Sequence, residues 1–265
     1  MEILGYLLTI VIGVLVGLFG GGGSILTVPV LVYLFAVQAS LATTYSLALV
    51  SVTSLIAAIP HVFNKQISFK KALQFGLPSL IALYSVRAFV LPSIPNQLNF
   101  FGIILSKNLF MLIFFSILML VSGVFMIKQK RKEPDCIDCP YNSFVLIFTG
   151  FVEGIITGIV GAGGGFIIVP VLMIFGKLRM KQAVANSLLI IGIKSLIGFL
   201  GSKDVIHLNF EFLSELIIIA IIGMIIGLQL NKRLDSKQLK PIFGYFVFGM
   251  GMFILFKELI FSLFV

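Results

Sequence analysis

Long apolar segments separated by short polar stretches dominate this chain. Between Ile3 and Asn64, 62 consecutive residues include no Asp, Glu, Lys or Arg. Such a run cannot form a water-facing surface, and it is far longer than the roughly 20 apolar residues that one membrane-spanning helix requires. We therefore expect lipid to surround most of the chain. This excludes a soluble enzyme, a nucleic-acid-binding domain and a disordered chain.

A glycine-rich segment that leads to a proline occurs twice. Residues 13–31 and 154–172 align at a constant offset of 141 positions, which pairs Gly13 with Gly154 and Pro29 with Pro170. The same register continues for more than 40 residues, which indicates an internal duplication.

Each copy contains five apolar segments, at 3–19, 25–36, 42–60, 72–91 and 108–127 in the first and at 143–160, 166–176, 183–201, 212–230 and 241–263 in the second. The second segment of each copy is too short to span hydrocarbon, so we predict a half-helix that follows a break at the glycine run. This divides the chain into a first transmembrane repeat (1–127), a cytoplasmic linker (128–140) and a second transmembrane repeat (141–265).

Basic residues set the expected orientation. Four clusters hold 14 of the 19 Lys and Arg residues, at 65–71, 128–132, 177–181 and 232–240. If the first two segments of each copy together cross the membrane an even number of times, all four clusters lie on one face. A single broken span would instead separate 177–181 from 128–132. The positive-inside rule favours the first arrangement and makes the shared face cytoplasmic.

This arrangement turns the two copies upside down relative to each other. The predicted fold is an all-α polytopic membrane protein of two inverted repeats, each with a Gly-broken helix pair plus three transmembrane helices. Inverted repeats with paired broken helices are typical of secondary transporters. We expect a multi-pass protein of the cell inner membrane with both termini outside the cytoplasm.

The two glycine runs are the first candidate substrate site. Backbone N–H groups at a helix break and the N-terminus of the following half-helix together attract anions. The candidates are Gly20, Gly21, Gly22, Gly23 and Ser24, with Gly161, Gly163, Gly164 and Gly165 in the second copy. The alternative is that small residues merely let helices pack closely, an interpretation that suits Gly13, Gly17, Gly154 and Gly158. We expect Pro29 and Pro170 to mark where the half-helices begin.

Three ionisable residues lie within apolar segments. A charge at the centre of a membrane helix costs about 2.5–3.5 kcal/mol, so such residues face the bundle interior or a cavity. Arg87 and Lys194 are candidates to attract an anionic substrate, and Glu153 is a candidate for proton coupling. The alternative is that Glu153 and Lys194 form a structural ion pair.

Polar side chains of the third segments, Ser46, Asn186 and Ser187, could line a substrate path or cap their helices. Cys136 and Cys139 form one C-x-x-C pair in the linker, for which we weigh a redox or metal role against a simple turn. One such pair lacks the four ligands of a zinc site, so we expect no metal and no cofactor. No Walker A motif is present, which argues against ATP hydrolysis by this chain.

The paired glycine–proline segments resemble the sulfite exporter TauE/SafE family of membrane permeases, and the resemblance covers nearly the whole chain. It implies transport of sulfite, sulfonates or related sulfur-containing anions, and no enzymatic activity. The expected partners are a small inorganic or organic anion and membrane lipid, with a homodimer left open and no nucleic acid. Two alternatives remain: a sulfur-handling membrane protein that uses the Cys136 and Cys139 thiols, and an anion channel.

Overall fold

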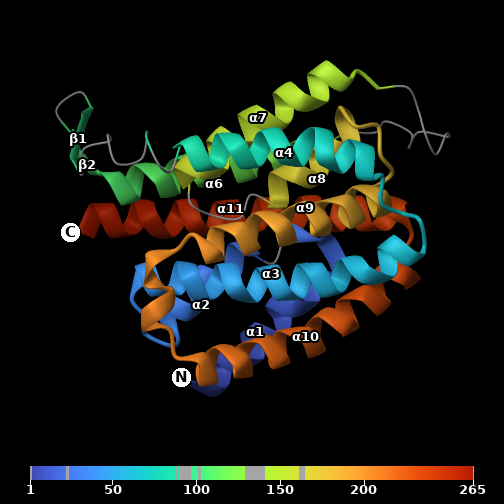
Figure 1. Cartoon of the computed structure of the whole chain (residues 1–265). Coiled ribbons are helices and arrows are strands. Elements are labelled where there is room, and N and C mark those ends of the chain that lie inside the picture. The colour runs from blue at the N-terminus through green and yellow to red at the C-terminus, as the bar shows by residue number, and fades with distance from the viewer. Residues whose placement is uncertain are drawn as a thin grey trace.

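The computed structural model describes residues 2–21, 24–86, 89, 97–100, 103–128, 141–160 and 165–264, and shows a bundle of long helices (Figure 1). Each of the ten predicted apolar segments contains a helix. The helices of the first copy are α1 (Glu2–Phe19), α2 (Ser24–Tyr33), α3 (Ala39–Phe63), α4 (Phe69–Ser85) and α6 (Lys107–Lys128). Those of the second copy are α7 (Ser143–Val160), α8 (Gly165–Ile174), α9 (Met180–Leu200), α10 (Phe210–Arg233) and α11 (Ser236–Phe264). A 3-10 turn, η3 (Lys203–His207), precedes α10.

A short β-hairpin precedes α6 and was not predicted. Strand β1 (Gln97–Phe100) pairs antiparallel with β2 (Ile103–Ser106), and Phe100 lies opposite Ile103. Each strand has four residues, too few to produce a periodic pattern that distinguishes a strand from a connection. The described fold is otherwise helical, as expected.

Four of the described helices are long and apolar enough to cross a membrane. They are Leu41–Phe63, Met180–Leu200, Phe210–Arg233 and Gln238–Lys257. Shorter apolar stretches of described residues occur at Ile3–Phe19, Ser116–Lys128, Ser143–Gly158 and Gly165–Ile174. Many large apolar side chains of the described helices are exposed, among them Leu73 of α4 and Ile222 of α10. Outward apolar side chains at this density suit a lipid environment.

Each copy packs its first helix against the fourth helix of the other copy. Helix α1 lies along α10, and α7 lies along α4. A Cβ atom on Gly13 would lie 2.1 Å from the carbonyl oxygen of Ala220, and one on Gly154 would lie 2.2 Å from that of Ser79. Ala220 and Ser79 are themselves 141 positions apart. The close-packing interpretation of these glycines is therefore confirmed, and both copies use the same contact.

Equivalent helices of the two copies also pack against each other, and they do so antiparallel. In the α3–α9 pair, Leu47 lies beside Gly198, and Leu55 lies beside Gly192, earlier in α9. In the α6–α11 pair, Met119 in the middle of α6 lies beside Gly251, and Ile127 in its last turn lies beside Gly244, earlier in α11. These pairs form the middle of the bundle (Figure 1).

The two half-helices end in the same way. The third residue after each is left-handed without being glycine, with φ of 52° at Ala36 and 49° at Lys177. The N–H of Val37 then donates to the carbonyl of Leu31 at 3.0 Å, and the equivalent bond in the second copy measures 3.2 Å. This backbone bond between residues six apart occurs at both helix ends and satisfies a carbonyl of the last turn of each half-helix.

The prolines do not mark the start of the half-helices, so that prediction is wrong. Pro29 and Pro170 are each the sixth residue of their helix, inside α2 and α8. A proline at this position leaves the carbonyl four residues earlier without its helical donor. In the second copy this carbonyl belongs to Phe166, and the Ser122 hydroxyl of α6 donates to it at 3.5 Å. A neighbouring helix thus restores the lost bond.

The basic clusters at 65–71, 177–181 and 232–240 gather at one end of the bundle in the part of the chain that the structure describes. The Nζ of Lys181 donates to the Lys232 carbonyl at 3.3 Å, and the Nζ of Lys71 lies 4.8 Å above the ring of Tyr141, which follows the linker. The start of α1 and the end of α11 lie at the opposite end of the bundle (Figure 1).

Candidate functional site

The first glycine run passes tightly against helix α9. Gly20 has a φ of +76°, a conformation that glycine adopts without cost and other residues rarely adopt. A Cβ atom here would lie 2.4 Å from the Ser187 hydroxyl and 3.2 Å from the Val184 carbonyl oxygen. Both the backbone angle and the close approach therefore require glycine at this position.

The two glycine runs meet each other. A Cβ atom on Gly21 would lie 2.4 Å from the Cα of Gly165, which is the first residue of α8. Both glycines are buried. Since α2 begins at Ser24, three residues after Gly21, the break that precedes α2 contacts the N-terminus of α8 here. We call Gly20, Gly21, Gly165 and Ser187 the glycine junction.

Partial positive charge is concentrated at this junction. The N-terminus of each half-helix carries N–H groups without a partner in their own helix, and each has a field equivalent to roughly half a positive charge. Two such ends that face one buried point can hold a small anion. In this structure the junction is closed, since the backbones of Gly21 and Gly165 touch.

Other predicted site residues lie outside the described part of the chain. These are Gly22, Gly23, Arg87, Cys136, Cys139, Gly161, Gly163 and Gly164. Among the residues that the structure does describe, no three His, Cys, Asp or Glu side chains gather as metal ligands.

Lys194 and Glu153 form a buried ion pair. The Nζ of Lys194 lies 3.0 and 3.1 Å from the two carboxylate oxygens of Glu153, 2.7 Å from the Ser79 hydroxyl and 3.4 Å from the Thr157 hydroxyl. Ser79 also donates to Glu153. These four side chains, from α4, α7 and α9, are the lysine cluster. The alternative interpretation, an ion pair between Glu153 and Lys194, is confirmed, and the charge of Lys194 is paired within the protein.

The positions related to this cluster by the 141-residue offset form no such cluster. Ile12, Val16 and Ala220 stand where Glu153, Thr157 and Ser79 stand, and all three are buried. Thr53 replaces Lys194, and its hydroxyl bonds to the Leu49 carbonyl of its own helix at 2.7 Å. The same helix contact therefore occurs twice in the fold, once with mainly apolar side chains and once with a buried ion pair. Packing alone does not explain the ion pair, because the apolar set fills the same place.

Asn186 and its counterpart Tyr45 each accept a hydrogen bond from the backbone of the loop that precedes α4 or α10. The Asn186 side chain accepts from the Ser68 N–H at 3.1 Å and donates to the Gln182 carbonyl at 2.7 Å. Tyr45 accepts from the Asn209 N–H at 2.7 Å. Ser68 and Asn209 are equivalent residues that precede α4 and α10. Two different side chains therefore hold the same loop in the two copies.

Ser46 and Ser187 are buried, at the same register in α3 and α9. The helices begin at Ala39 and Met180, more than a turn earlier, so neither serine is a cap. The Ser187 hydroxyl donates to the Val184 carbonyl at 2.8 Å, and its oxygen faces Gly20. Of the polar candidates in these two helices, Ser187 is the one that the structure places at the glycine junction.

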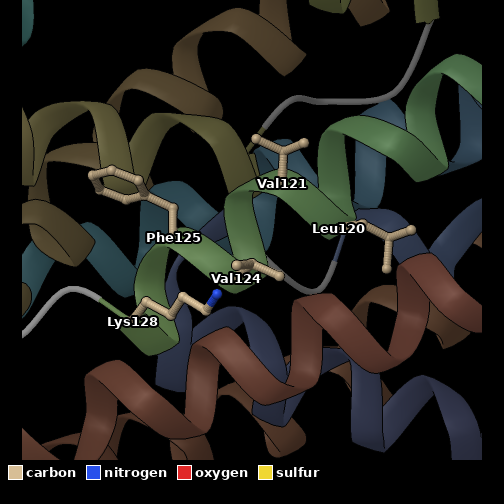
Figure 2. A pocket seen from close by; sticks show the side chains of 5 residues that line it. All are labelled: Leu120, Val121, Val124, Phe125 and Lys128. Atoms are coloured by element: carbon tan, nitrogen blue, oxygen red, sulfur yellow. The ribbon is translucent and has the colours of Figure 1, made fainter.

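Two hollows differ in their chemistry. Figure 2 shows one of about 550 Å³, bordered by Leu120, Val121, Val124, Phe125 and Lys128 of α6. All five residues come from one helix and four are apolar, so this is a groove on an outer face and unsuited to a small anion. The other, of about 160 Å³, is lined by polar side chains at the basic end of the bundle: His61, Asn64, Gln66, Lys181, Asn231 and Lys232.

We call this second hollow the basic pocket. The sequence reasoning missed it, because it used Lys181 and Lys232 only to set orientation. The signal available in the sequence was the position of His61 and Asn231, two polar residues at the ends of otherwise apolar segments.

An all-α bundle with several membrane-spanning helices and a doubled glycine break defines a multi-pass membrane protein. The chain belongs to the sulfite exporter TauE/SafE family, whose model matches residues 6–254. A probable membrane transporter protein of Xylella fastidiosa (strain Temecula1) is 28% identical over 257 residues, covering 93% of this chain and 92% of the relative. A probable membrane transporter protein of Methanocaldococcus jannaschii is 27% identical over 263 residues, covering 92% of both chains.

A third relative, the probable membrane transporter protein YunE of Bacillus subtilis, is 27% identical and covers 88% of this chain and 91% of the relative. No solved structure is significantly similar to this chain. The family and these relatives identify the protein as a membrane transporter and not an enzyme.

Proposed function

We propose that this transporter is a secondary permease for small anions, of the sulfite or sulfonate type, in the cytoplasmic membrane. The observation that carries the proposal is the buried contact between Gly21, three residues before α2 begins, and Gly165, the first residue of α8. Small oxyanions are the ligands that such helix ends bind. The family name supports the choice of sulfur-containing anions.

Alternating access follows from the proposed inversion of the two copies. Antiparallel packing of α3 on α9 and of α6 on α11 supports this inversion, as does the shared contact of Gly13 and Gly154 with equivalent carbonyls. Two inverted copies can exchange conformations, and each exchange opens the central junction to the opposite side. In the closed junction seen here, the two copies must separate at Gly21 and Gly165 to admit an anion.

The lysine cluster is the element that we assign to coupling. Protonation of Glu153 would remove its attraction for Lys194 and leave a buried charge unpaired, which is costly. A change at this cluster is transmitted to the junction along α9, since Lys194 lies one turn after Ile191, whose side chain would meet a Cβ atom on Gly21. This gives the second copy a proton-sensitive element that the first copy lacks.

Uptake into vesicles tests the proposal. Purified protein is reconstituted in proteoliposomes, and the initial rates of sulfite, thiosulfate, sulfoacetate and chloride uptake are measured against concentration. The proposal predicts saturable uptake of at least one sulfur oxyanion and little uptake of chloride. Rates that stay linear with concentration indicate a channel instead, and no uptake of any of the four anions contradicts the proposed function.

A further inference from the structure

The basic pocket adjoins the glycine junction. The side-chain nitrogen of Asn231 donates to the Leu18 carbonyl at 2.6 Å, and Leu18 lies two residues before Gly20. Lys181 is one turn before Val184, whose carbonyl oxygen faces Gly20. The end of α1 and the start of α9 thus run from the wall of the pocket to the junction.

Hydrogen-bond donors dominate the polar lining of this pocket. Lys181 and Lys232 each carry an ammonium group with three donors, and the bond from Lys181 to the Lys232 carbonyl uses one of the three donors of Lys181. None of the described residues that line the pocket is acidic. A wall with two cations and no carboxylate favours an anion.

His61 adds a buried ring at the same place. Its Nδ1 lies 2.5 Å from the Gln66 side-chain oxygen, and the residue is only 6% exposed. The Nε2 of this ring is buried and has no hydrogen-bond partner among the described residues. Buried polar atoms are normally paired, and unpaired ones are often functional. One of the residues that line the pocket therefore carries a buried hydrogen-bonding atom that no described residue partners.

The volume and flanks limit the size of the ligand. Pockets for drug-sized molecules occupy about 300–1,000 Å³, whereas this one has about 160 Å³. Only an anion of a few heavy atoms fits. Pro60 and Leu228 supply an apolar flank that also accommodates a short carbon chain.

We propose that the basic pocket binds a small oxyanion at the cytoplasmic face and delivers it to the glycine junction. The charges belong to one end of the protein only, because the repeat places Ser40 and Leu91 at the positions equivalent to Lys181 and Lys232. This inference rests on the proposed function and adds a first binding step to it. Loss of the two lysines weakens binding from the cytoplasmic side and leaves the other side unaffected.

A double variant, Lys181→Gln with Lys232→Gln, tests this step. Its matched control is Lys70→Gln with Lys128→Gln, which removes two exposed charges from the same basic end but none from the pocket. Inside-out membrane vesicles present the basic face to the added anion, and right-side-out vesicles present the opposite face. KM for sulfite and for sulfoacetate is measured in both, after thermal unfolding shows that each variant is folded.

We expect the pocket variant to raise KM about tenfold in inside-out vesicles, the scale of lost hydrogen bonds to a charged group. In right-side-out vesicles KM stays within about twofold, as it does for the control in both. A higher KM for sulfite alone indicates that the pocket binds an inorganic anion. A higher KM for both sulfite and sulfoacetate indicates that the pocket recognises the oxyanion group that they share. Equal KM values for the pocket variant and the control, with wild-type flux intact, overturn the pocket and leave the proposed function standing.

If the wild type shows no flux, the proposed function fails and direct binding decides on the pocket. Equilibrium dialysis of detergent-purified protein with radiolabelled sulfite then compares the same variants. Binding that only the pocket variant loses supports the pocket as an anion site. Absence of binding in the wild type, or equal binding in all variants, overturns it.

Discussion

Lys194 and Glu153 form a buried ion pair, with Nζ 3.0 Å from Oε2, between helices α9 and α7. Both side chains are almost fully enclosed, at 5% and 1% exposure. Removal of one member of such a pair leaves a buried charge without a partner and costs about 3–5 kcal/mol. Replacement of the whole set by well-packed apolar groups is often neutral.

The duplication supplies the replacement set, since the equivalent space is filled by Ile12, Val16 and Thr53 of the first copy and by Ala220 of the second. We predict that Glu153→Ala lowers the free energy of unfolding by about 3–5 kcal/mol, whereas the fourfold variant S79A/E153I/T157V/K194T stays within about 1 kcal/mol of wild type. Thermal unfolding in detergent measures both. The same fourfold variant should lose uptake driven by a pH gradient. Full pH-driven uptake in this variant would contradict the coupling role of the cluster.

The shared glycine contacts predict equal damage in both copies. Gly13→Ala and Gly154→Ala each place a Cβ atom about as close to a carbonyl oxygen, at 2.1 and 2.2 Å. We expect each to destabilise the protein by about 1–3 kcal/mol through overpacking. Gly249→Ala is the control, because no atom apart from its chain neighbours and its own helix backbone lies within 4 Å of its Cβ position. A loss of stability in one copy only would contradict the equivalence of the two contacts.

The basic clusters at one end of the bundle predict which end faces the cytoplasm, because basic loops are usually cytoplasmic. In a background with Cys136 and Cys139 replaced by serine, Lys70→Cys should react with a membrane-impermeant thiol reagent only in inside-out vesicles. Ile206→Cys, at a residue 87% exposed in η3 near the opposite end, should react only in right-side-out vesicles. Reaction of both from the same side would contradict the predicted orientation.

Substitution of Cys136 and Cys139 distinguishes an anion permease from a protein that depends on thiol chemistry. We predict that C136S/C139S keeps the wild-type rate and KM of sulfite uptake, because the proposed anion route involves no thiol. The rate of uptake in proteoliposomes with and without a reducing agent measures this. Loss of uptake in the double variant would favour the sulfur-handling alternative.

Much of the fold could be predicted from the sequence, because apolar length and a repeated motif report on it directly. The apolar segments and their repetition at an offset of 141 residues predicted the ten helices. The ends of α7 (Ser143–Val160) coincide with the predicted segment. The hairpin β1–β2 was missed because its four-residue strands carry no periodic signal. The positions of Pro29 and Pro170 inside their half-helices were also not predicted. A helix tolerates such a proline when a neighbour replaces the lost hydrogen bond, as Ser122 of α6 does in α8, and the sequence does not reveal this contact.

The site was predictable in part. Glycine runs and buried charges are visible in a sequence, and the structure joins Gly20, Gly21, Gly165 and Ser187. The contact between Lys194 and Glu153 was one of two open interpretations, because pairing between helices depends on their rotation. The basic pocket could not be predicted, since its lining comes from three separate helix ends that only the folded bundle brings together.

The central claim is that the glycine junction is where the anion passes, and one comparison tests it most directly. Gly21→Ala forces α8 away from the first break, because its Cβ atom would lie 2.4 Å from the Gly165 Cα. Gly17→Ala is the matched control, with a similar clash of 2.3 Å against the Met224 carbonyl in the α1–α10 contact. The measurement is the initial rate of saturable sulfite uptake per folded protein in proteoliposomes.

The account predicts that Gly21→Ala lowers the maximal uptake rate at least about tenfold, while Gly17→Ala retains most of it, because only the first substitution alters the half-helix ends that hold the anion. Wild-type uptake by Gly21→Ala, or equal losses in both variants, would show that the anion does not pass between Gly21 and Gly165.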